Sequence, residues 1–184
     1  VSDVVCPWCI IGYKQVEKAL TLLPEPVEAE FHWHPFELNP DLPPEGEDAA
    51  EHITRKYGRS PEEGKAVRTQ IRDTAAALGF EFGDRGARRL YNTFAAHKLL
   101  TKAGEVLGWE KANDIGIERA SAADWLADQT LSGAVRAEER YWIGENISGV
   151  PAIIFDGTFM VPGAQSAETF AGVIGKVLAK RSAE

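Results

Sequence analysis

The sequence predicts an α/β fold in which two small strand-containing units, one at each end of the chain, flank a helical middle. Three patterns predict this fold class. A strand–helix–strand pattern opens the chain, helical periodicity dominates the middle, and a strand–turn–strand–helix pattern closes it. The 184 residues, 44% of them hydrophobic, are enough for one domain that carries an insertion.

The first unit is predicted from residues 2–36. Residues 2–5 are β-branched enough to end a strand, and apolar residues then recur at steps of three and four from Trp8 to Leu23, which predicts a helix that Pro24 stops. In residues 27–34 apolar and polar side chains alternate strictly, as in a half-buried strand. Because the crossover is long enough for parallel pairing, these elements are expected to form a βαβ unit.

The middle of the chain is predicted to be helical after an extended, proline-rich connector over Glu37–Asp48. Ser60, followed by a proline and an acidic third residue, is a typical helix start, and Asn92 is a second capping residue. Gly79 and Gly108 are the expected helix stops. Four helical segments are predicted here, over residues 60–79, 92–107, 120–133 and 135–145.

The last unit combines a hairpin with a helix. Ala152–Phe155 and Thr158–Val161 are predicted strands, and the Asp156-Gly157 pair between them is a strong signal for a tight turn. Ser166 is expected to cap a final helix with one apolar stripe. The stripe consists of Phe170, Val173, Ile174, Val177 and Leu178.

The order βαβ, helices, ββα, with a C-x-x-C motif at the start of the first helix, resembles the thioredoxin layout split by an insertion. We therefore expect an α/β, thioredoxin-like fold (βαβ…ββα) interrupted by an all-helical insertion. Residues 1–44 and 134–184 are predicted to form the discontinuous thioredoxin-like domain. Residues 45–133 are predicted to form the helical insertion domain.

Cys6 and Cys9, in the motif Cys6-Pro7-Trp8-Cys9, are the only cysteines of the chain. A chain of this length buries a core without staples, and a disulfide across so short a loop adds little stability, so redox chemistry explains the pair better. Cys6 lies at a predicted helix N-terminus, where free N–H groups and the helix dipole stabilise a thiolate. We expect Cys6 to attack and the less exposed Cys9 to resolve the mixed disulfide.

Two other interpretations of the cysteines are weaker. A structural zinc site needs four ligands, and His32 and His34 lie on one face of a predicted strand, so a two-Cys, two-His site is conceivable. The two thiols could also be inert and buried. The strand-to-helix context and the lack of a second C-x-x-C favour the redox interpretation, and no metal is expected.

Net charge and hydropathy limit the partners and the location. A net charge of −8 argues against nucleic acid or an anionic membrane as the main partner. The sequence has no apolar run of about 20 residues and no signal-peptide pattern, which favours a cytoplasmic protein. Val1 is not a natural start, so we expect residues before it. A monomer and a homodimer are both compatible with the sequence.

Four motifs in order resemble the FrnE-like branch of the DsbA family of dithiol-disulfide oxidoreductases. They are VSDVVCPWC at 1–9 with Ile11-Gly12, WHPFELNP at 33–40, NTFAAHKL at 92–99, and GVP at 149–151 with GAQ at 163–165. The resemblance implies a thioredoxin fold with an inserted helical domain and a cytosolic setting. It also implies activity on thiols of proteins or small molecules, with no bound cofactor and with glutathione as an optional substrate or reductant.

The resemblance also implies further site residues. Pro151 is expected to be cis and to face the cysteines, and Val150 is expected to pair with an extended substrate through its backbone. His97, His34 and Gln165 match motif positions and are weaker candidates for substrate binding. From its own chemistry, Trp8 is expected to offer an apolar contact surface beside the first cysteine.

Asp3 has two interpretations. It could be a buried carboxylate that accepts a proton from Cys9, or, as is more common for a residue just before a helix, a surface cap. A further expectation concerns residues 109–120, where relatives carry a longer, aromatic-rich stretch. We therefore expect a break in the chain near Asp114 and Ile115.

Two other functions remain open. The related 2-hydroxychromene-2-carboxylate isomerases and kappa glutathione transferases generally carry serine at the first active-site position and lack the second cysteine. A glutathione-dependent enzyme of this kind would not need Cys9 and would bind glutathione near Val150 and Gln165. A non-catalytic binder or chaperone would keep its activity without Cys6. The sequence favours an enzyme of the thiol-disulfide oxidoreductase type over both.

Overall fold

The structure is a computed structural model that describes residues 1–83, 89–107 and 117–183. Within these ranges, helices alternate with a few short strands, in agreement with the predicted fold class. In chain order the elements are α1 (Pro7–Thr21), β1 (Glu47–Asp48), α2 (Ala49–Tyr57), α3 (Pro61–Ala76), β2 (Arg89–Leu90), α4 (Phe94–Leu107), α5 (Arg119–Ala127), α6 (Gln129–Gly144), β3 (Ala152–Phe155), β4 (Phe159–Pro162) and α7 (Ala167–Arg181).

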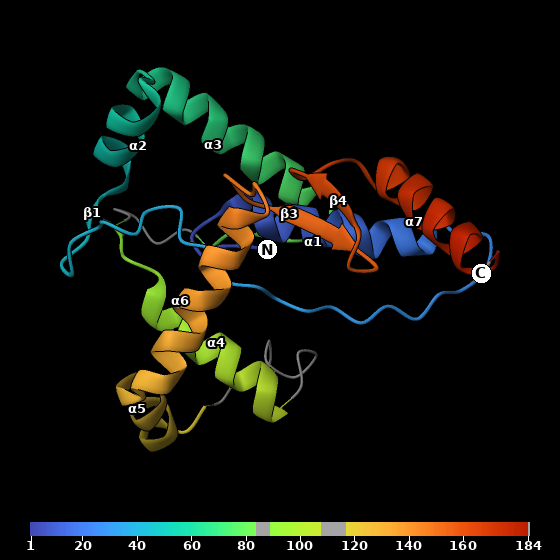
Figure 1. Ribbon diagram of the computed structural model, residues 1–184. Coiled ribbons are helices and arrows are strands. Elements are labelled where there is room, and N and C mark those ends of the chain that lie inside the picture. Colours follow the sequence, from blue (N-terminus) through green and yellow to red (C-terminus); the bar gives the residue numbers. More distant parts are fainter. Residues whose placement is uncertain (84–88, 108–116, 184) are drawn as a thin grey trace.

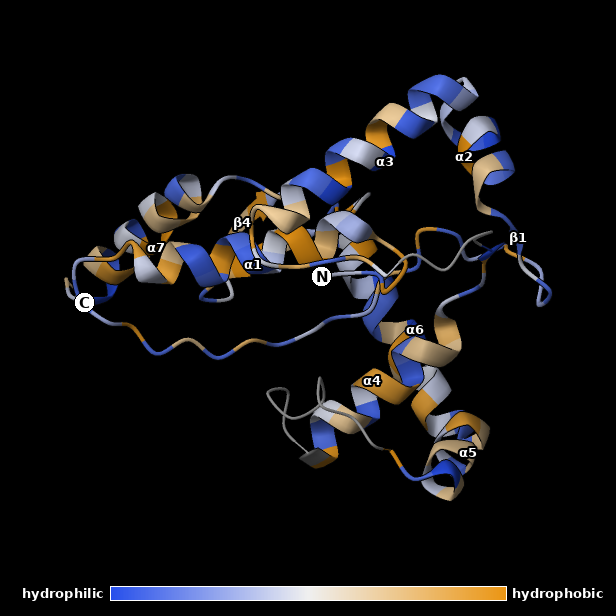
Figure 2. Cartoon of the chain, turned by 180° about the vertical axis from the view of Figure 1, so that it is seen from behind, coloured by the Kyte–Doolittle hydropathy of each residue, from blue (hydrophilic) through white to orange (hydrophobic). Residues whose placement is uncertain are grey.

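The elements form two bodies with an arm across one of them (Figure 1). Helices α1 and α7 pack side by side with the β3–β4 hairpin against them, while α4, α5 and α6 gather into a separate helical group. Helices α2 and α3 form the arm, and α3 reaches back to contact α1. The arm is mainly hydrophilic, whereas the hairpin beside α1 is hydrophobic (Figure 2).

The central layer is built from the hairpin and the N-terminal residues. Strands β3 and β4 are antiparallel, with Ala152 opposite Pro162. On the other edge of β3, Val1 and Ala152 exchange two backbone hydrogen bonds of 2.8 and 3.1 Å. Ser2 then makes a parallel bridge to Pro35. The lateral order is therefore residues 34–35, residues 1–2, β3 and β4.

The predicted strand over residues 27–34 is wrong, and the predicted βαβ unit is reduced to the Ser2–Pro35 bridge. A strand needs a hydrogen-bonded neighbour along its length, and no strand is assigned to the described residues 27–34. The alternation still has a packing role. Phe31 and Trp33 contact the Tyr13 ring of α1, with ring centroids 5.0 and 5.4 Å away.

An apolar core joins α1 to α7. Val16 and Ala19 of α1 pack against Phe170 and Ile174 of α7, and all four are buried. The turn between β3 and β4 matches the prediction from the Asp156-Gly157 pair. Asp156 and Gly157 both have positive φ, 54° and 63°, but the loop also includes Thr158, so β4 begins at Phe159, one residue later than predicted.

Predicted helix starts are confirmed where side chains cap them. Ser60 accepts the Glu63 N–H at 3.2 Å, and the Glu63 carboxylate accepts the Ser60 N–H at 2.8 Å. Asn92 Oδ1 accepts the N–H of Phe94, the first residue of α4, at 2.9 Å. Ser166 accepts the Thr169 N–H at 3.2 Å and begins α7.

The helical middle differs from the prediction in two places. Helix α2 was not predicted. The Asp48 side chain caps it by accepting hydrogen bonds from the N–H groups of Ala50 and Glu51, and Gly58, at φ 63°, ends it. The predicted break near residues 133–135 is wrong, because the Asp128 side chain caps α6 and this helix runs through Gly133. The predicted domain boundary between 133 and 134 therefore falls inside α6, while the division into two domains stays a prediction.

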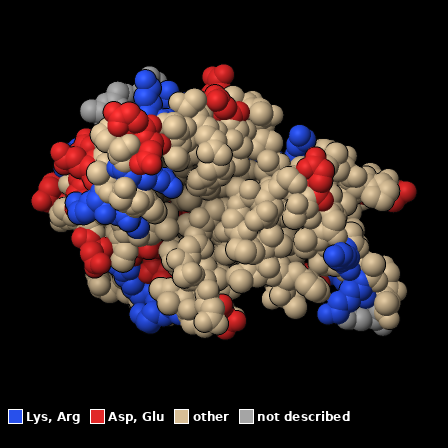
Figure 3. All heavy atoms as spheres, turned by 90° about the horizontal axis from the view of Figure 1, so that it is seen from above, with Lys and Arg blue, Asp and Glu red and all other residues tan. Residues whose placement is uncertain are grey.

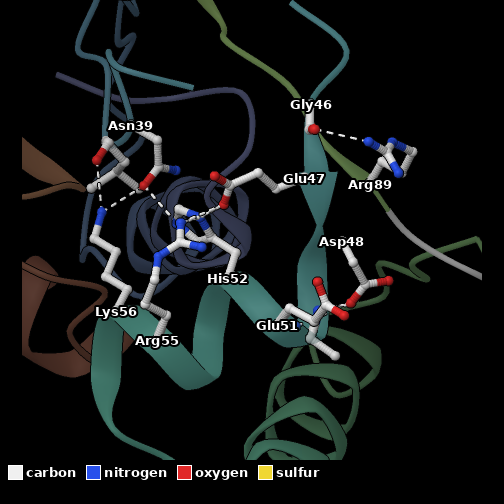
Figure 4. A network of polar contacts seen from close by, with 11 residues as sticks. Asn39, Gly46, Glu47, Asp48, Glu51, His52, Arg55, Lys56 and Arg89 are labelled. Carbon is white, nitrogen blue, oxygen red and sulfur yellow. Dashed lines mark hydrogen bonds and ion pairs between the residues drawn. The ribbon is translucent and has the colours of Figure 1, made fainter. Parts of the chain in front are cut away.

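A network of hydrogen bonds and ion pairs joins the connector over residues 37–48 to helix α2 (Figure 4). His52 is buried, with Nδ1 2.8 Å from Glu47 Oε2 and Nε2 3.0 Å from Asn39 Oδ1. Lys56 Nζ donates to the same Asn39 oxygen at 2.6 Å, and Arg55 pairs with Glu47 at 2.5 Å. Directional polar contacts therefore hold this part of the molecule.

Charged side chains gather toward the two ends of the face shown in Figure 3, and the middle of that face carries few of them. Within the described ranges, no helix is both long enough and apolar enough to cross a membrane.

Candidate active site

Cys6 and Cys9 lie at the start of α1, on the side of the helix that meets the central layer. Cys6 is the N-cap residue with extended backbone angles, φ −86° and ψ 111°, and Pro7 follows it in the first turn, where proline needs no hydrogen-bond partner. The Cys6 N–H donates to Asp3 O at 3.0 Å. Both cysteines are free thiols and both are buried, with exposed fractions of 9% and 6%.

The environment of Cys6 favours a thiolate. A hydrogen bond from the Cys9 thiol is the main reason why the pKa of Cys6 lies below its usual range. Burial of the sulfur opposes this effect, and the backbone N–H groups of Cys9 and Trp8 support it. These N–H groups belong to the open first turn of α1, so the helix terminus contributes as the sequence led us to expect.

Cys9 has the opposite electrostatics. Its pKa lies far above the usual range because its thiol proton is held by Cys6, because the sulfur is buried, and because a second negative charge beside Cys6 is unfavourable. The Asp3 backbone N–H, directed at the Cys9 sulfur, opposes these effects only in part. The two thiols therefore hold one proton at neutral pH. This proton is on Cys9, which donates it in a hydrogen bond to the Cys6 thiolate.

Val150 and Pro151 face the thiols from the loop before β3. Cys6 Sγ lies 3.6 Å from Val150 O, and the Val150–Pro151 peptide bond is cis, the configuration that the resemblance implied. Helix α1 approaches this loop closely because Gly12 has no side chain. A Cβ on Gly12 would lie 3.3 Å from both Pro151 Cγ and Ile153 Cδ1.

The weaker candidates are placed differently. Trp8 is half-buried in the first turn of α1, directly between the two cysteines in sequence. Gln165 is exposed and donates to Pro162 O at 2.8 Å. His34 pairs with Glu138 of α6 at 2.5 Å, and its ring lies 4.8 Å from the Trp142 ring. His34 therefore links the central layer to α6.

His97 is brought to the thiol site, but below the surface. It is only 3% exposed, with Nε2 3.1 Å from Phe36 O and 3.4 Å from Asp3 Oδ1. In this position the ring contacts protein groups that support the site and does not form part of an open substrate surface.

Asp3 is a buried carboxylate, 2% exposed, and not a surface cap. Burial raises its pKa, but hydrogen bonds from His97 and from the Leu38 N–H outweigh burial, and the pKa ends below its usual value. The Leu38 N–H donates to Oδ2 at 2.7 Å and the Val5 N–H to Oδ1 at 3.3 Å. A carboxylate so held stays ionised at neutral pH and is a poor acceptor for the Cys9 proton.

Sequence reasoning missed two supports of this carboxylate. The backbone N–H of Leu38 and the side chain of Thr93 both bond to Asp3. Both residues belong to the motifs at 33–40 and 92–99, which were the available signal. Within the described ranges, no group of three or more His, Cys, Asp and Glu side chains is placed to hold a metal ion. The expected break at Asp114 and Ile115 lies outside the described residues.

A family model supplies the deciding comparison. The DSBA-like thioredoxin domain matches residues 1–108 and 106–175. The chain belongs to this family. It is thereby placed among DsbA-like proteins, and the predicted fold class, a thioredoxin fold with a helical insertion, is confirmed.

A solved structure supports the assignment. The chain is similar to the crystal structure of a probable DsbA oxidoreductase from Streptomyces coelicolor, with 28% sequence identity and a TM-score of 0.84. The match covers 97% of this chain and 88% of that one. No curated protein sequence matches the chain. The DsbA-like fold and this neighbour agree with an enzyme of the oxidoreductase type.

Proposed function

We propose that this chain is a dithiol-disulfide oxidoreductase of the FrnE-like branch, with Cys6 as the attacking thiol and Cys9 as the resolving thiol. One observation carries the proposal. Two buried thiols share one proton at a helix N-terminus, and their pKa values are displaced in opposite directions. A nucleophile that is ionised at neutral pH beside a protonated reserve thiol is the arrangement that disulfide exchange requires.

The reaction balances on these two sulfurs. The Cys6 thiolate attacks one sulfur of a substrate disulfide, forms a mixed disulfide and releases the other substrate sulfur as a thiolate. Cys9 then gives up its proton and attacks Cys6 Sγ, which closes the Cys6–Cys9 disulfide and releases the second substrate thiolate. The substrate gains two electrons and the pair loses two. Run in reverse, the same steps oxidise a dithiol substrate.

The loop before β3 is the proposed substrate platform. Val150 O lies 3.6 Å from Cys6 Sγ, so a backbone N–H of an extended substrate that bonds to this carbonyl is placed beside the reacting sulfur. Trp8, half-buried in the first turn, is the neighbouring aromatic surface. This arrangement suits extended peptides and small thiols, which are the proposed substrate classes.

Trapping tests the assignment of the two roles. We expect Cys9→Ser, mixed with a disulfide-bonded peptide or with glutathione disulfide, to accumulate a mixed disulfide on Cys6 that mass spectrometry detects. Cys6→Ser is the matched control and should trap far less, because Cys9 stays buried and burial by itself raises the pKa of its thiol. Equal trapping by both variants, or none by either, would contradict the proposed roles.

The glutathione-dependent alternative gives a different result. An isomerase or transferase would bind reduced glutathione with undiminished affinity when Cys9 is replaced by serine. The oxidoreductase requires that the parent protein form a Cys6–Cys9 disulfide when equilibrated with glutathione redox buffers, with thiol alkylation as the readout. A pair that stays reduced across the whole titration would remove the proposed function.

A further inference from the structure

Asp3 contacts both thiols through its backbone. Its carbonyl oxygen accepts the Cys6 N–H at 3.0 Å, and its own N–H is directed at the Cys9 sulfur. A shift of this one residue would therefore move the backbone at Cys6 and the hydrogen bond to Cys9 together. The position of Asp3 is thus part of the geometry of the thiol site, although its carboxylate is not among the reacting groups.

The Asp3 carboxylate is anchored by four donors, which are two backbone N–H groups, the His97 ring and the Thr93 hydroxyl. Leu38 N–H lies 2.7 Å from Oδ2, Val5 N–H lies 3.3 Å from Oδ1, and His97 Nε2 lies 3.4 Å from Oδ1. His97 lies on α4, and Thr93 directly precedes this helix. Only these two donors can be removed by a side-chain substitution.

The environment fixes the proton on His97. Its Nε2 faces Phe36 O at 3.1 Å and Asp3 Oδ1 at 3.4 Å, and both of these atoms can only accept. Nε2 therefore carries the proton and donates toward both. Three titratable side chains interact with Asp3 or His97. They are Cys6 and Cys9 at the start of α1 and Glu139 on α6. The Thr93 hydroxyl also bonds to Asp3.

We propose that His97 is a positioning residue of the thiol exchange site and that it acts on Cys6 through Asp3. By donating to the carboxylate, His97 holds the backbone of residues 3–6 in place and compensates the negative charge beside the Cys6 sulfur. The inference rests on the proposed function, because it concerns the equilibrium of the same two thiols. It goes beyond that function by assigning His97 a role without substrate contact.

The two partners should shift the thiol pair in opposite directions. The Asp3 charge opposes a second negative charge on Cys6 and so raises the pKa of that thiol. Removing the charge in Asp3→Asn should favour the thiolate and, with it, the reduced pair. Removing the compensating donor in His97→Leu should disfavour the thiolate and favour the disulfide. A purely structural role would make both variants less stable without opposite effects on the redox equilibrium.

The test measures the Cys6 thiolate by ultraviolet absorbance across pH and the dithiol–disulfide equilibrium against glutathione. We expect His97→Leu to shift the equilibrium about tenfold toward the disulfide and Asp3→Asn about tenfold toward the dithiol, each equal to about 30 mV. In the double variant the His97→Leu shift should vanish, because its route through Asp3 is gone. The pH midpoint of Cys6 should move up in the first variant and down in the second.

Two controls keep the test specific. His97→Gln retains an N–H donor and should restore most of the parent equilibrium. His52→Leu removes another buried histidine, which is bonded to a different carboxylate, Glu47, and should leave the thiol equilibrium unchanged. If His97→Leu fails to fold, Asp3→Asn decides the question, because no shift or a shift toward the disulfide would contradict the inference.

Any of three results would overturn the inference while leaving the proposed function intact. The first is a His97→Leu protein that forms the disulfide with the parent's equilibrium and the parent's Cys6 titration. The second is an Asp3→Asn shift toward the disulfide, and the third is an undiminished His97→Leu shift in the Asp3→Asn background. Failure of the proposed function is a separate outcome, in which the parent itself forms no Cys6–Cys9 disulfide.

Discussion

The thiol-bearing part of the molecule and its helical part are held together by different kinds of contact. Between α1, the hairpin and α7, the buried side chains are apolar, and Val16, Ala19, Phe170 and Ile174 form one cluster. In the connector, α2 and the α4–α6 group, buried polar side chains are prominent instead. They are His52, Thr93, His97, Lys98 and Glu139.

The difference teaches where each part is sensitive. Apolar burial is non-directional and depends on volume and close packing, whereas a buried polar group depends on specific partners. Lys98, for example, is 3% exposed, and its ammonium donates to Leu126 O at 2.7 Å and to Asp128 O at 2.9 Å, near the end of α5. The thiol part should tolerate isosteric change, and the helical part should not tolerate the loss of a donor.

The largest expected effect comes from opening the apolar core. Phe170 of α7 is fully buried against Ala19 and Phe155, and Phe170→Ala should lower the free energy of unfolding by about 3–5 kcal/mol. Chemical denaturation gives this value. Phe159→Ala, at a half-buried position of β4, is the control and should cost clearly less. Equal losses would show that the α1–α7 core is not the dominant source of stability.

Two buried carboxylates, one in each part, should differ in their response to pH. The pKa of Asp3 is lowered, so its ionised form contributes stability above about pH 4, and this contribution is lost as the pH falls through the folded-state pKa. Asp3→Asn should flatten this acid limb and cost about 1–3 kcal/mol at neutral pH, because the hydrogen bonds to the charged group are lost. Unfolding free energies measured from acidic to neutral pH test this.

Glu139 provides the contrast. Burial and the nearby Glu37 charge raise its pKa, and one of its carboxylate oxygens has no hydrogen-bond partner among the described residues. The protonated Glu139 carboxyl therefore contributes its full stability below about pH 4.3. This contribution to the free energy of unfolding is lost as the pH rises through the folded-state pKa. Glu139→Gln should remove that decline. A parent-like pH profile in both variants would contradict the assignment of these two groups.

The next prediction sharpens the comparison inside the helical part. Lys98→Met keeps most of the side-chain volume but removes the donor to the two carbonyls at the end of α5, and should cost about 1–2 kcal/mol. Hydrogen exchange should locate the effect near residues 126–128. Lys102→Met, which loses only a surface pair with Glu105, should leave the stability close to that of the parent. If Lys98→Met lost as little stability as Lys102→Met, water would have to bond to the two carbonyls in place of the Lys98 ammonium.

Local signals were enough to predict much of the thiol part. The Asp156-Gly157 turn, the cap at Ser166 and the C-x-x-C spacing each depend on a few adjacent residues, and each was predicted from them. Residues 27–34 show the limit of such signals. Their alternation is real, but a strand also needs a neighbour from elsewhere in the chain, and pairing with residues 1–2 is confined to one bridge.

The supports of the thiol site show the same limit. Cys6 and Cys9 could be found from their spacing, but the donors to Asp3 come from Leu38 and His97, which lie far away along the chain. Helix α2 was missed for a different reason. Its Asp48 cap and Gly58 stop are present in the sequence, but the nine-residue helix follows a proline-rich connector and carries few large apolar residues.

The smallest expected effect concerns a serine helix cap that occurs once in each part of the molecule. Ser60 begins α3 and Ser166 begins α7, and each accepts an N–H from the third residue of its helix at 3.2 Å. Replacing either serine by alanine should cost its helix about 1 kcal/mol. Global unfolding should report the full loss for Ser166→Ala, because α7 is part of the apolar core. Since α3 belongs to the arm, hydrogen exchange should show the Ser60→Ala loss mainly as faster local opening of α3. Equal global losses would mean that the arm unfolds together with the core, and that the two parts differ in their contacts but not in their cooperativity.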